Sequence, residues 1–299
     1  MINPTAKLIS NLFSTKIPQR PTRDGFGEGL VLAAEKNPAI IGLCADLTES
    51  TRMLAFKQKF PERFIQLGVH EQFLTAMAAG LALGGKIPFI ASYAMFCPGR
   101  SWEQVRTNIC LNNVNVKIAG AHAGVSVGPD GATHQAIEDI AITRVIPNMT
   151  IVVPCDSVQT KKATLAVAKN IGPVYLRFGR EKSPVFTTDA TPFKIGDAQI
   201  LRKGRDVALI ACGMLVYNAL LAAQELAKKG IDCMVINNHT IKPMDEKTII
   251  AAAKTCRAIV TIEEHQVQGG MGSRVAEILS ANFPVPIEFI GGHNRFGES

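Results

Sequence analysis

The feature that most constrains the fold is a regular alternation of short β-branched runs with longer segments whose apolar residues recur at helical spacing. Runs of the first kind lie at 39–47, 62–68, 87–95, 114–123 and 148–154. Such alternation is typical of a parallel sheet that helices cover on both faces. The sequence therefore predicts an α/β fold.

The pattern lapses at 181–198, where Pro, Thr and charged residues are frequent, and then resumes. Further β-branched runs follow at 206–213, 231–237 and 258–264, with an amphipathic stretch at 218–230. We therefore expect two domains, each a mainly parallel sheet covered by helices. Their predicted ranges are 21–185 and 195–299, after a polar leader at 1–20, a segment whose basic composition also occurs in mitochondrial presequences.

Composition narrows the class of function. The net charge is +7, but there is no basic run and only 6% of residues are aromatic, so phosphorylated small molecules fit better than nucleic acid. No apolar run reaches the roughly 18 residues that cross a membrane. The seven scattered cysteines include no C-x-x-C pair, which predicts reduced thiols and a cytoplasmic location.

The common short motifs are incomplete. Gly25, Gly27 and Gly29 follow no predicted strand, so they do not make a dinucleotide site. His70 and Glu71 begin a zinc motif that fails at its fifth position, and we expect no metal site in this chain alone. Ser126 lies in a glycine-rich loop instead of the strand-to-helix turn that a nucleophilic serine needs.

Two segments, 67–96 and 121–156, carry more information. Glu71 begins an Ala-rich amphipathic helix directly after a predicted strand, where a carboxylate among apolar neighbours can hold or donate a proton. The alternative is a glutamate that only stabilises the start of a helix. His122, Asp130 and His134 lie on a glycine-rich loop, where backbone can approach a ligand closely.

These segments resemble the pyrimidine-binding domain of transketolases and of 1-deoxyxylulose-5-phosphate synthases, from about residue 20 onward. The resemblance is carried by A-D-L-T-E-S at 45–50, G-V-H-E-Q at 68–72, S-Y-A-M-F at 92–96 and G-P-D-G-A-T-H-Q at 128–135. The segments at 211–220, 242–249 and 263–277 are similar to the C-terminal domain of the same enzymes.

The resemblance implies that thiamine diphosphate is the cofactor and that Glu71 protonates N1′ of its aminopyrimidine. Phe96 would stack on the pyrimidine with Tyr93 beside it, and Asp46 would approach the cofactor. Phe96 could otherwise be a plain core residue.

The resemblance also implies a site for sugar phosphates. Arg23, Ser50, His122 and Arg180 would bind the phosphate, and Asp130 and His134 would bind sugar hydroxyls, with both histidines taking part in catalysis. The alternative for each is a solvated surface residue.

The departures from the family define a missing half. Transketolases hold Mg²⁺ and the diphosphate on a preceding domain with a G-D-G motif and downstream asparagines, and this sequence has neither in the required arrangement. The stretch 97–106 is one residue longer than in single-chain relatives, which leaves the roles of Gly99 and Arg100 open, and the sequence stops at 294–299 where a short terminal helix is expected.

The favoured interpretation is the C-terminal subunit of a transketolase that moves a two-carbon ketol unit between sugar phosphates. Its partner would be an N-terminal subunit that carries the Mg²⁺ ligands, and we expect self-association about a two-fold axis. The alternatives are a 1-deoxyxylulose-5-phosphate synthase-like enzyme, a 2-oxo acid dehydrogenase β subunit and a non-catalytic homologue.

Overall fold

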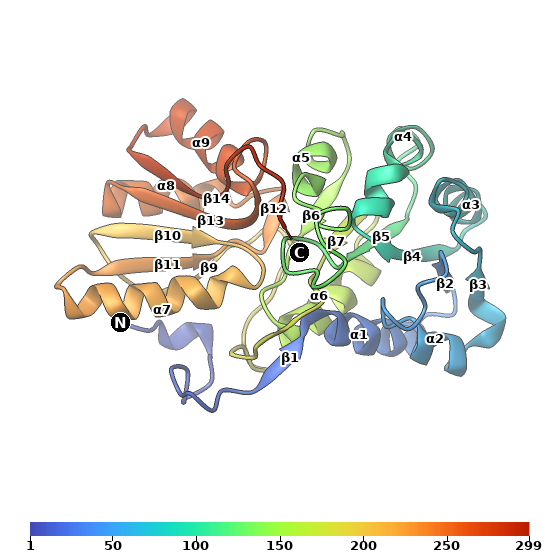
Figure 1. Cartoon of the computed structure of the whole chain (residues 1–299), viewed down its shortest axis with the longest axis horizontal. Coiled ribbons are helices and arrows are strands. Elements are labelled where there is room, and N and C mark those ends of the chain that lie inside the picture. Colours follow the sequence, from blue (N-terminus) through green and yellow to red (C-terminus); the bar gives the residue numbers. More distant parts are fainter. Residues whose placement is uncertain (299) are drawn as a thin grey trace.

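Seven strands form the largest of three sheets in the computed structural model, which describes residues 1–298 (Figure 1). Their order is β12-β6-β7-β5-β4-β2-β3, and all neighbours run parallel except β12 and β6. The strands are β2 (Ile40–Cys44), β3 (Phe64–Gln66), β4 (Ile87–Tyr93), β5 (Lys117–Ala121), β6 (Thr150–Val152), β7 (Val174–Arg177) and β12 (Thr240–Lys242).

The second sheet has the order β14-β13-β10-β11-β9, in which only β9 is antiparallel to its neighbour. Its strands are β9 (Gln199–Arg202), β10 (Val207–Ala211), β11 (Cys233–Asn237), β13 (Ile259–Gln266) and β14 (Ile287–Gly292). A short antiparallel pair joins β1 (Gln19–Pro21) to β8 (Lys182–Pro184). The predicted α/β class with mainly parallel sheets is confirmed.

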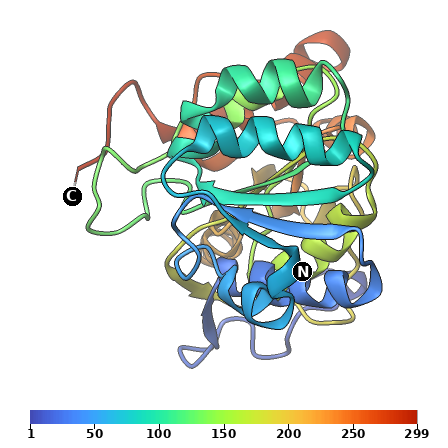
Figure 2. The same cartoon turned by 90° about the vertical axis from the view of Figure 1, so that its right-hand side faces the viewer.

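Helices cover both faces of the larger sheet, as Figure 2 shows end-on. Buried side chains of α1 (Thr22–Lys36), α2 (Leu54–Lys59) and α6 (Ser157–Lys169) pack on one face. Those of α3 (Glu71–Leu83) and α5 (Asp139–Arg144) pack on the other, near the short α4 (Trp102–Gln104). The second sheet carries α7 (Leu215–Lys228), α8 (Glu246–Cys256) and α9 (Met271–Asn282). No helix in residues 1–298 is long and apolar enough to cross a membrane.

Close packing explains the glycines of α1. A Cβ atom on Gly25 would lie 1.9 Å from the carbonyl oxygen of Ser157, and one on Gly29 would lie 2.7 Å from Cβ of Thr164. Both contacts are with α6 and are shorter than van der Waals distances, so only glycine lets the two helices approach this closely. Gly25 and Gly29 therefore serve helix packing.

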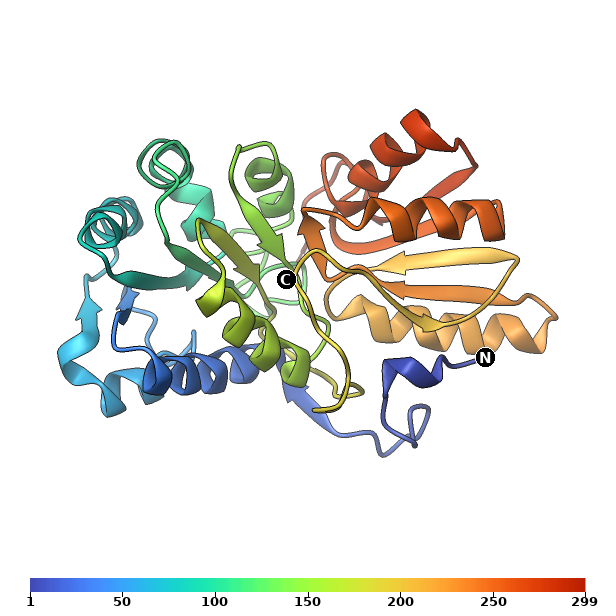
Figure 3. The same cartoon turned by 180° about the vertical axis from the view of Figure 1, so that it is seen from behind.

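The two halves of the chain interlock. Strand β12 lies beyond the predicted domain boundary, yet it pairs with β6 in the larger sheet. Residues 1–18, which make up most of the polar leader expected at 1–20, run along the second domain beside α7 (Figure 3). Leu12 is buried there and its carbonyl accepts a hydrogen bond of 2.9 Å from the Tyr217 hydroxyl.

A buried ionic group ties the two domains together at α5. Nε of Arg177 lies 2.7 Å from Oδ2 of Asp139, and the Tyr175 hydroxyl donates to the same oxygen at 2.6 Å. Burial alone would raise the pKa of Asp139, but Arg177 outweighs it and holds that pKa below its usual value. Arg177 also donates to the backbone carbonyl of Glu264 in β13 at 2.9 Å, so one cation links both sheets.

Candidate active site

Five of the predicted site residues follow strands at one edge of the larger sheet. The carboxyl ends of parallel strands meet at the same edge, which is where ligands bind in open α/β sheets. Each of β2, β3, β4, β5 and β7 is followed within a few residues by one of them: Asp46, Glu71, Phe96, His122 and Arg180 respectively.

Glu71 is a buried carboxylate at the start of α3, with 1% of its surface exposed. Its Oε2 atom lies 2.7 Å from Nη1 of Arg100, and Ser92 Oγ donates to its Oε1 at 3.4 Å. The free N–H groups of the first helical turn also favour a negative charge there. Arg100, whose role the sequence left open, is thus the cation that faces Glu71.

Phe96 and Tyr93 provide an aromatic wall beside this carboxylate. Their ring centroids are 6.1 Å apart with nearly parallel planes, and the ring of His134 meets Phe96 edge-on at 5.3 Å. The guanidinium of Arg100 lies over Phe96 at 4.7 Å while it pairs with Glu71. A flat group with N–H donors can therefore contact Phe96 and Glu71 together, as an aminopyrimidine would have to do.

His122 is neutral, and one of its ring nitrogens is buried without a hydrogen-bond partner in residues 1–298. Its Nε2 lies 3.4 Å from Nη1 of Arg23, and a guanidinium can only donate, so Nε2 accepts and Nδ1 carries the proton. No partner for Nδ1 is found among residues 1–298. Burial, assisted by Arg23 and Arg180, lowers the pKa of His122 to about 3. The ring stacks on Tyr93 at 4.0 Å, which fixes its orientation.

The cations beside His122 form a second group. Arg23 donates from Nη1 to the Ser50 carbonyl at 3.0 Å, and burial together with Arg52 lowers the pKa of Arg23. Arg180 donates from Nη1 to Asp130 Oδ2 at 2.9 Å and to the Val127 carbonyl at 2.8 Å. Clustered guanidinium groups near a neutral donor suit an anion such as a phosphate.

Comparison with known proteins identifies the family. Residues 19–185 match the transketolase pyrimidine binding domain, and residues 196–299 match the transketolase C-terminal domain. The chain belongs to the transketolase family. This family consists of thiamine-dependent transferases.

The transketolase relatives include separate sections of this length. A Methanocaldococcus jannaschii protein named for a transketolase C-terminal section is 42% identical over 280 residues, which is 93% of this chain and 88% of that protein. A solved structure described as split gene transketolase, inactive β4 tetramer, has a TM-score of 0.87 at 43% identity, over 93% of this chain and 90% of that one. The transketolase of Campylobacter jejuni has a TM-score of 0.78 at 25% identity, and the match covers 96% of this chain but only 44% of that one.

Asp46 is the predicted residue that stands apart. It is exposed beyond β2, and its Oδ1 accepts a hydrogen bond of 3.1 Å from Gln66. Among the described residues, neither a hydrogen bond nor a ring contact joins it to Glu71, Phe96 or Tyr93. Its contact with the cofactor therefore stays a prediction.

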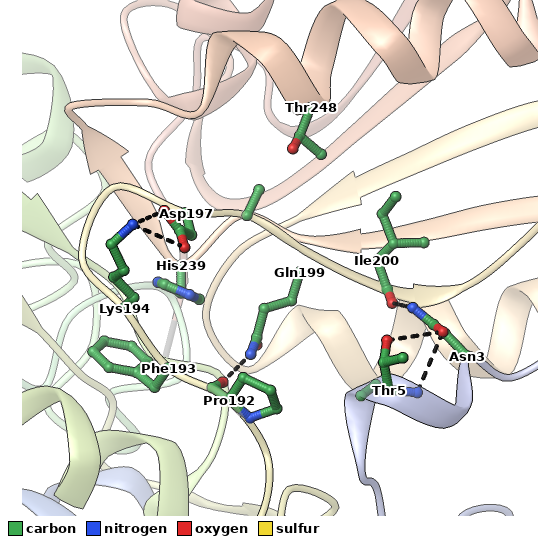
Figure 4. A pocket seen from close by; sticks show the side chains of 12 residues that line it. Asn3, Thr5, Pro192, Phe193, Lys194, Asp197, Gln199, Ile200, His239 and Thr248 are labelled. Atoms are coloured by element: carbon green, nitrogen blue, oxygen red, sulfur yellow. Dashed lines mark hydrogen bonds and ion pairs between the residues drawn. The ribbon is translucent and has the colours of Figure 1, made fainter.

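The structure also contains a cavity that is separate from the predicted site residues. This cavity, of about 500 Å³, lies between the N-terminal segment and residues 192–200. His239 is in its wall (Figure 4). None of the predicted site residues lines it. Within residues 1–298, no cluster of three or more His, Cys, Asp or Glu side chains is suited to a metal ion.

Because His122 and His239 are neutral in the fold, we expect the free energy of unfolding to fall in mild acid. In the unfolded chain a histidine gains a proton below about pH 6.5, whereas His122 in the fold does so only near 3, and burial lowers the pKa of His239 to about 4. Their contribution is therefore complete above about pH 6.5 and is lost as the pH falls toward 4. Each histidine should remove roughly 1.4 kcal/mol of unfolding free energy per pH unit.

Urea unfolding between about pH 7 and pH 5 measures this slope. His122→Phe keeps a ring to stack on Tyr93 but cannot titrate, so its slope should be shallower than that of the parent chain. His293→Asn, at an exposed position, is the control and should leave the slope unchanged. An identical slope in the His122 variant and the parent would show that His122 is not held neutral.

Proposed function

We propose that this chain is the C-terminal subunit of a thiamine-diphosphate-dependent transketolase. With a separate N-terminal subunit it would transfer a two-carbon ketol unit between sugar phosphates. The observation that carries the proposal is that one side chain, Arg100, contacts both buried Glu71 and the Phe96 ring, with the arginine and histidine group on the far side of Tyr93. Family membership and the separate transketolase section among the relatives support this proposal. Neither observation favours one of the alternatives.

The carbanion chemistry of such a reaction comes from thiamine diphosphate when it is bound. Glu71 would hold the proton that passes to and from N1′ of the aminopyrimidine, because its carboxylate is buried and fixed at the start of α3. Phe96 would support one face of that ring. His134, edge-on to Phe96, would lie where the reacting carbons of the sugar meet the cofactor.

Arg100 would have to leave its position for the pyrimidine to reach both contacts. Its guanidinium now makes the same pair of contacts, one with Glu71 and one with Phe96. The side chain is 48% exposed, so it can turn toward solvent without breaking the core. Among the residues that the sequence left without a role, Arg100 is thus the one that touches the proposed cofactor site.

The second group of side chains would bind the sugar phosphate. Arg23 and Arg180 supply positive charge, the Nδ1–H group of His122 supplies a neutral donor, and Ser50 lies beside Arg23. Arg180 now pairs with Asp130, so a bound phosphate would take over that cation and release the Asp130 carboxylate for a sugar hydroxyl. His134 would contact the hydroxyls from the same loop.

Exposed apolar side chains around Glu71 support a protein partner. Val69 and Phe73 lie two residues before and after Glu71, and Met95 directly precedes Phe96. All three are exposed large hydrophobic residues. Such side chains around a polar site indicate a surface that another protein covers. We propose that the N-terminal subunit covers it and brings the Mg²⁺ ligands, and that two copies of each chain assemble about a two-fold axis in the cytoplasm. The description of the split-gene structure as an inactive β4 tetramer agrees with such a need for a partner.

The direct test of the proposal is Glu71→Gln in the assembled complex. Glutamine keeps the size and helix propensity of the residue but cannot carry the proton. The C2 hydrogen of bound thiamine diphosphate should exchange with deuterium about 10²–10⁴-fold more slowly in the variant. Glu62→Gln, which changes a carboxylate that is 69% exposed, is the control and should exchange like wild type. Equally fast exchange in the Glu71 variant would remove this residue from the mechanism.

Phosphate recognition is tested by a pair of variants at one ion pair. Arg180→Met should remove a charge-assisted contact and raise KM for phosphorylated acceptors about 10- to 150-fold, with little change for unphosphorylated aldehydes. Asp130→Asn removes the same ion pair but keeps the cation, so it should preserve the preference for phosphorylated acceptors. Equal losses for both kinds of acceptor in Arg180→Met would show that Arg180 only holds Asp130.

A further inference from the structure

The glycine-rich loop at 124–136 carries Asp130 and His134, and it is closed at its base. The Gly124 N–H group donates to the Ala136 carbonyl at 2.8 Å. Gly124 and Ala136 are buried, whereas Pro129, Asp130, Ala132 and Thr133 at the tip are exposed. The position of the tip therefore depends on how firmly the two ends of the loop are held.

Both ends of this loop are held by the C-terminal domain. On the first side, Ser126 N donates to Oε1 of Glu264 at 2.6 Å. On the second side, Gln266 N donates to the Ile137 carbonyl at 2.8 Å. Gln266 is the last residue of β13, and Glu264 lies two residues before it. The end of one strand therefore contacts both ends of the loop.

The Glu264 carboxylate lies in a place shaped for it. Gly124 has a φ of +92°, and a Cβ atom there would lie 2.4 Å from Cδ of Glu264. Any larger residue at 124 would therefore push the carboxylate away. Nη2 of Arg177 fixes the backbone on the same side, because it donates to the Glu264 carbonyl at 2.9 Å and to the Ala136 carbonyl at 3.2 Å.

We propose that Glu264 is a positioning residue, by which the C-terminal domain clamps the loop that carries Asp130 and His134. A hydrogen bond between a backbone N–H group and a carboxylate is stronger than one between neutral groups. Release of Ser126 would free the first half of the loop. Asp130 and His134 would then lose their fixed distance from Arg180 and Phe96.

The expected effect of the clamp on KM rests on the proposed function, whereas the clamp itself does not. Loss of Glu264 should raise KM for the sugar phosphate, because the loop would have to be ordered on binding. It should leave cofactor affinity unchanged, because Glu71 and Phe96 lie on α3 and after β4, and their described contacts do not include Glu264.

Hydrogen–deuterium exchange of the purified chain, read by mass spectrometry, tests the clamp without any activity. Glu264→Leu removes the acceptor, and amides of 125–134 should exchange about 10-fold faster or more. Glu264→Gln still offers an amide oxygen to Ser126 N but loses the charge, so its exchange should lie between that of the parent and that of Glu264→Leu. Glu288→Gln, at an exposed position in the neighbouring strand β14, is the control. Peptides from β5 should stay protected in all variants, which excludes global unfolding.

Gly124→Ala provides a second variant, because its Cβ atom displaces the carboxylate and its φ of +92° is unfavourable for alanine, so it too should give faster exchange in the loop. In the assembled enzyme, Glu264→Leu should raise KM for the sugar phosphate about 10-fold and leave the Kd of thiamine diphosphate within about 2-fold. Unchanged loop exchange in both the Leu and Ala variants would overturn the clamp. Faster exchange with an unchanged KM would uphold the clamp and overturn the placement of Asp130 and His134 in the substrate site.

Discussion

The burial of one carboxylate determines how the rest of the site is arranged. A charged group without water costs several kcal/mol unless it is paired and hydrogen-bonded. Glu71 is paired with Arg100 and accepts a hydrogen bond from the Ser92 hydroxyl, and its place in the first turn of α3 also favours a negative charge. Because α3 follows β3, the carboxylate lies at the carboxyl edge of the sheet, and β4, the second neighbour of β2, brings Phe96 to the same edge. The segments that follow β3 and β4 thus supply a proton carrier and a flat apolar surface at the same edge of the sheet.

Local patterns were sufficient to predict the class of the fold and many of its strands, although β7, β9 and β14 lie outside the predicted runs. The β-branched runs at 39–47 and 87–95 contain β2 and β4, because a buried parallel strand needs continuous apolar residues. The pairing of β12 with β6 in the larger sheet could not be predicted. Contact between 240–242 and 151–152 leaves no periodic signal in either segment. The same holds for residues 1–18, whose polar composition hides the few side chains, such as Leu12, that pack on the second domain.

The candidate site was predictable to the extent that its residues follow strands. Glu71, Phe96, Tyr93, His122 and His134 are brought into one group, as the shared edge of a parallel sheet requires. The pairing of Arg100 with Glu71 was missed because an inserted residue obscured its register with the family. Glu264 was missed because 138 residues separate it from Ser126, and no spacing rule connects such positions. A hint lay in Gly124, since a glycine that tolerates no side chain marks a close approach by another part of the chain.

The central claim is that this chain supplies half of a cofactor site and that a partner subunit supplies the other half. Calorimetric titration with thiamine diphosphate in the presence of Mg²⁺ tests it most directly, with this chain alone and with this chain mixed with an N-terminal subunit that carries the G-D-G motif. We expect weak binding by the chain alone and at least about 100-fold tighter binding by the mixture, a gain of roughly 2.7 kcal/mol. Equally tight binding by the chain alone would contradict the claim.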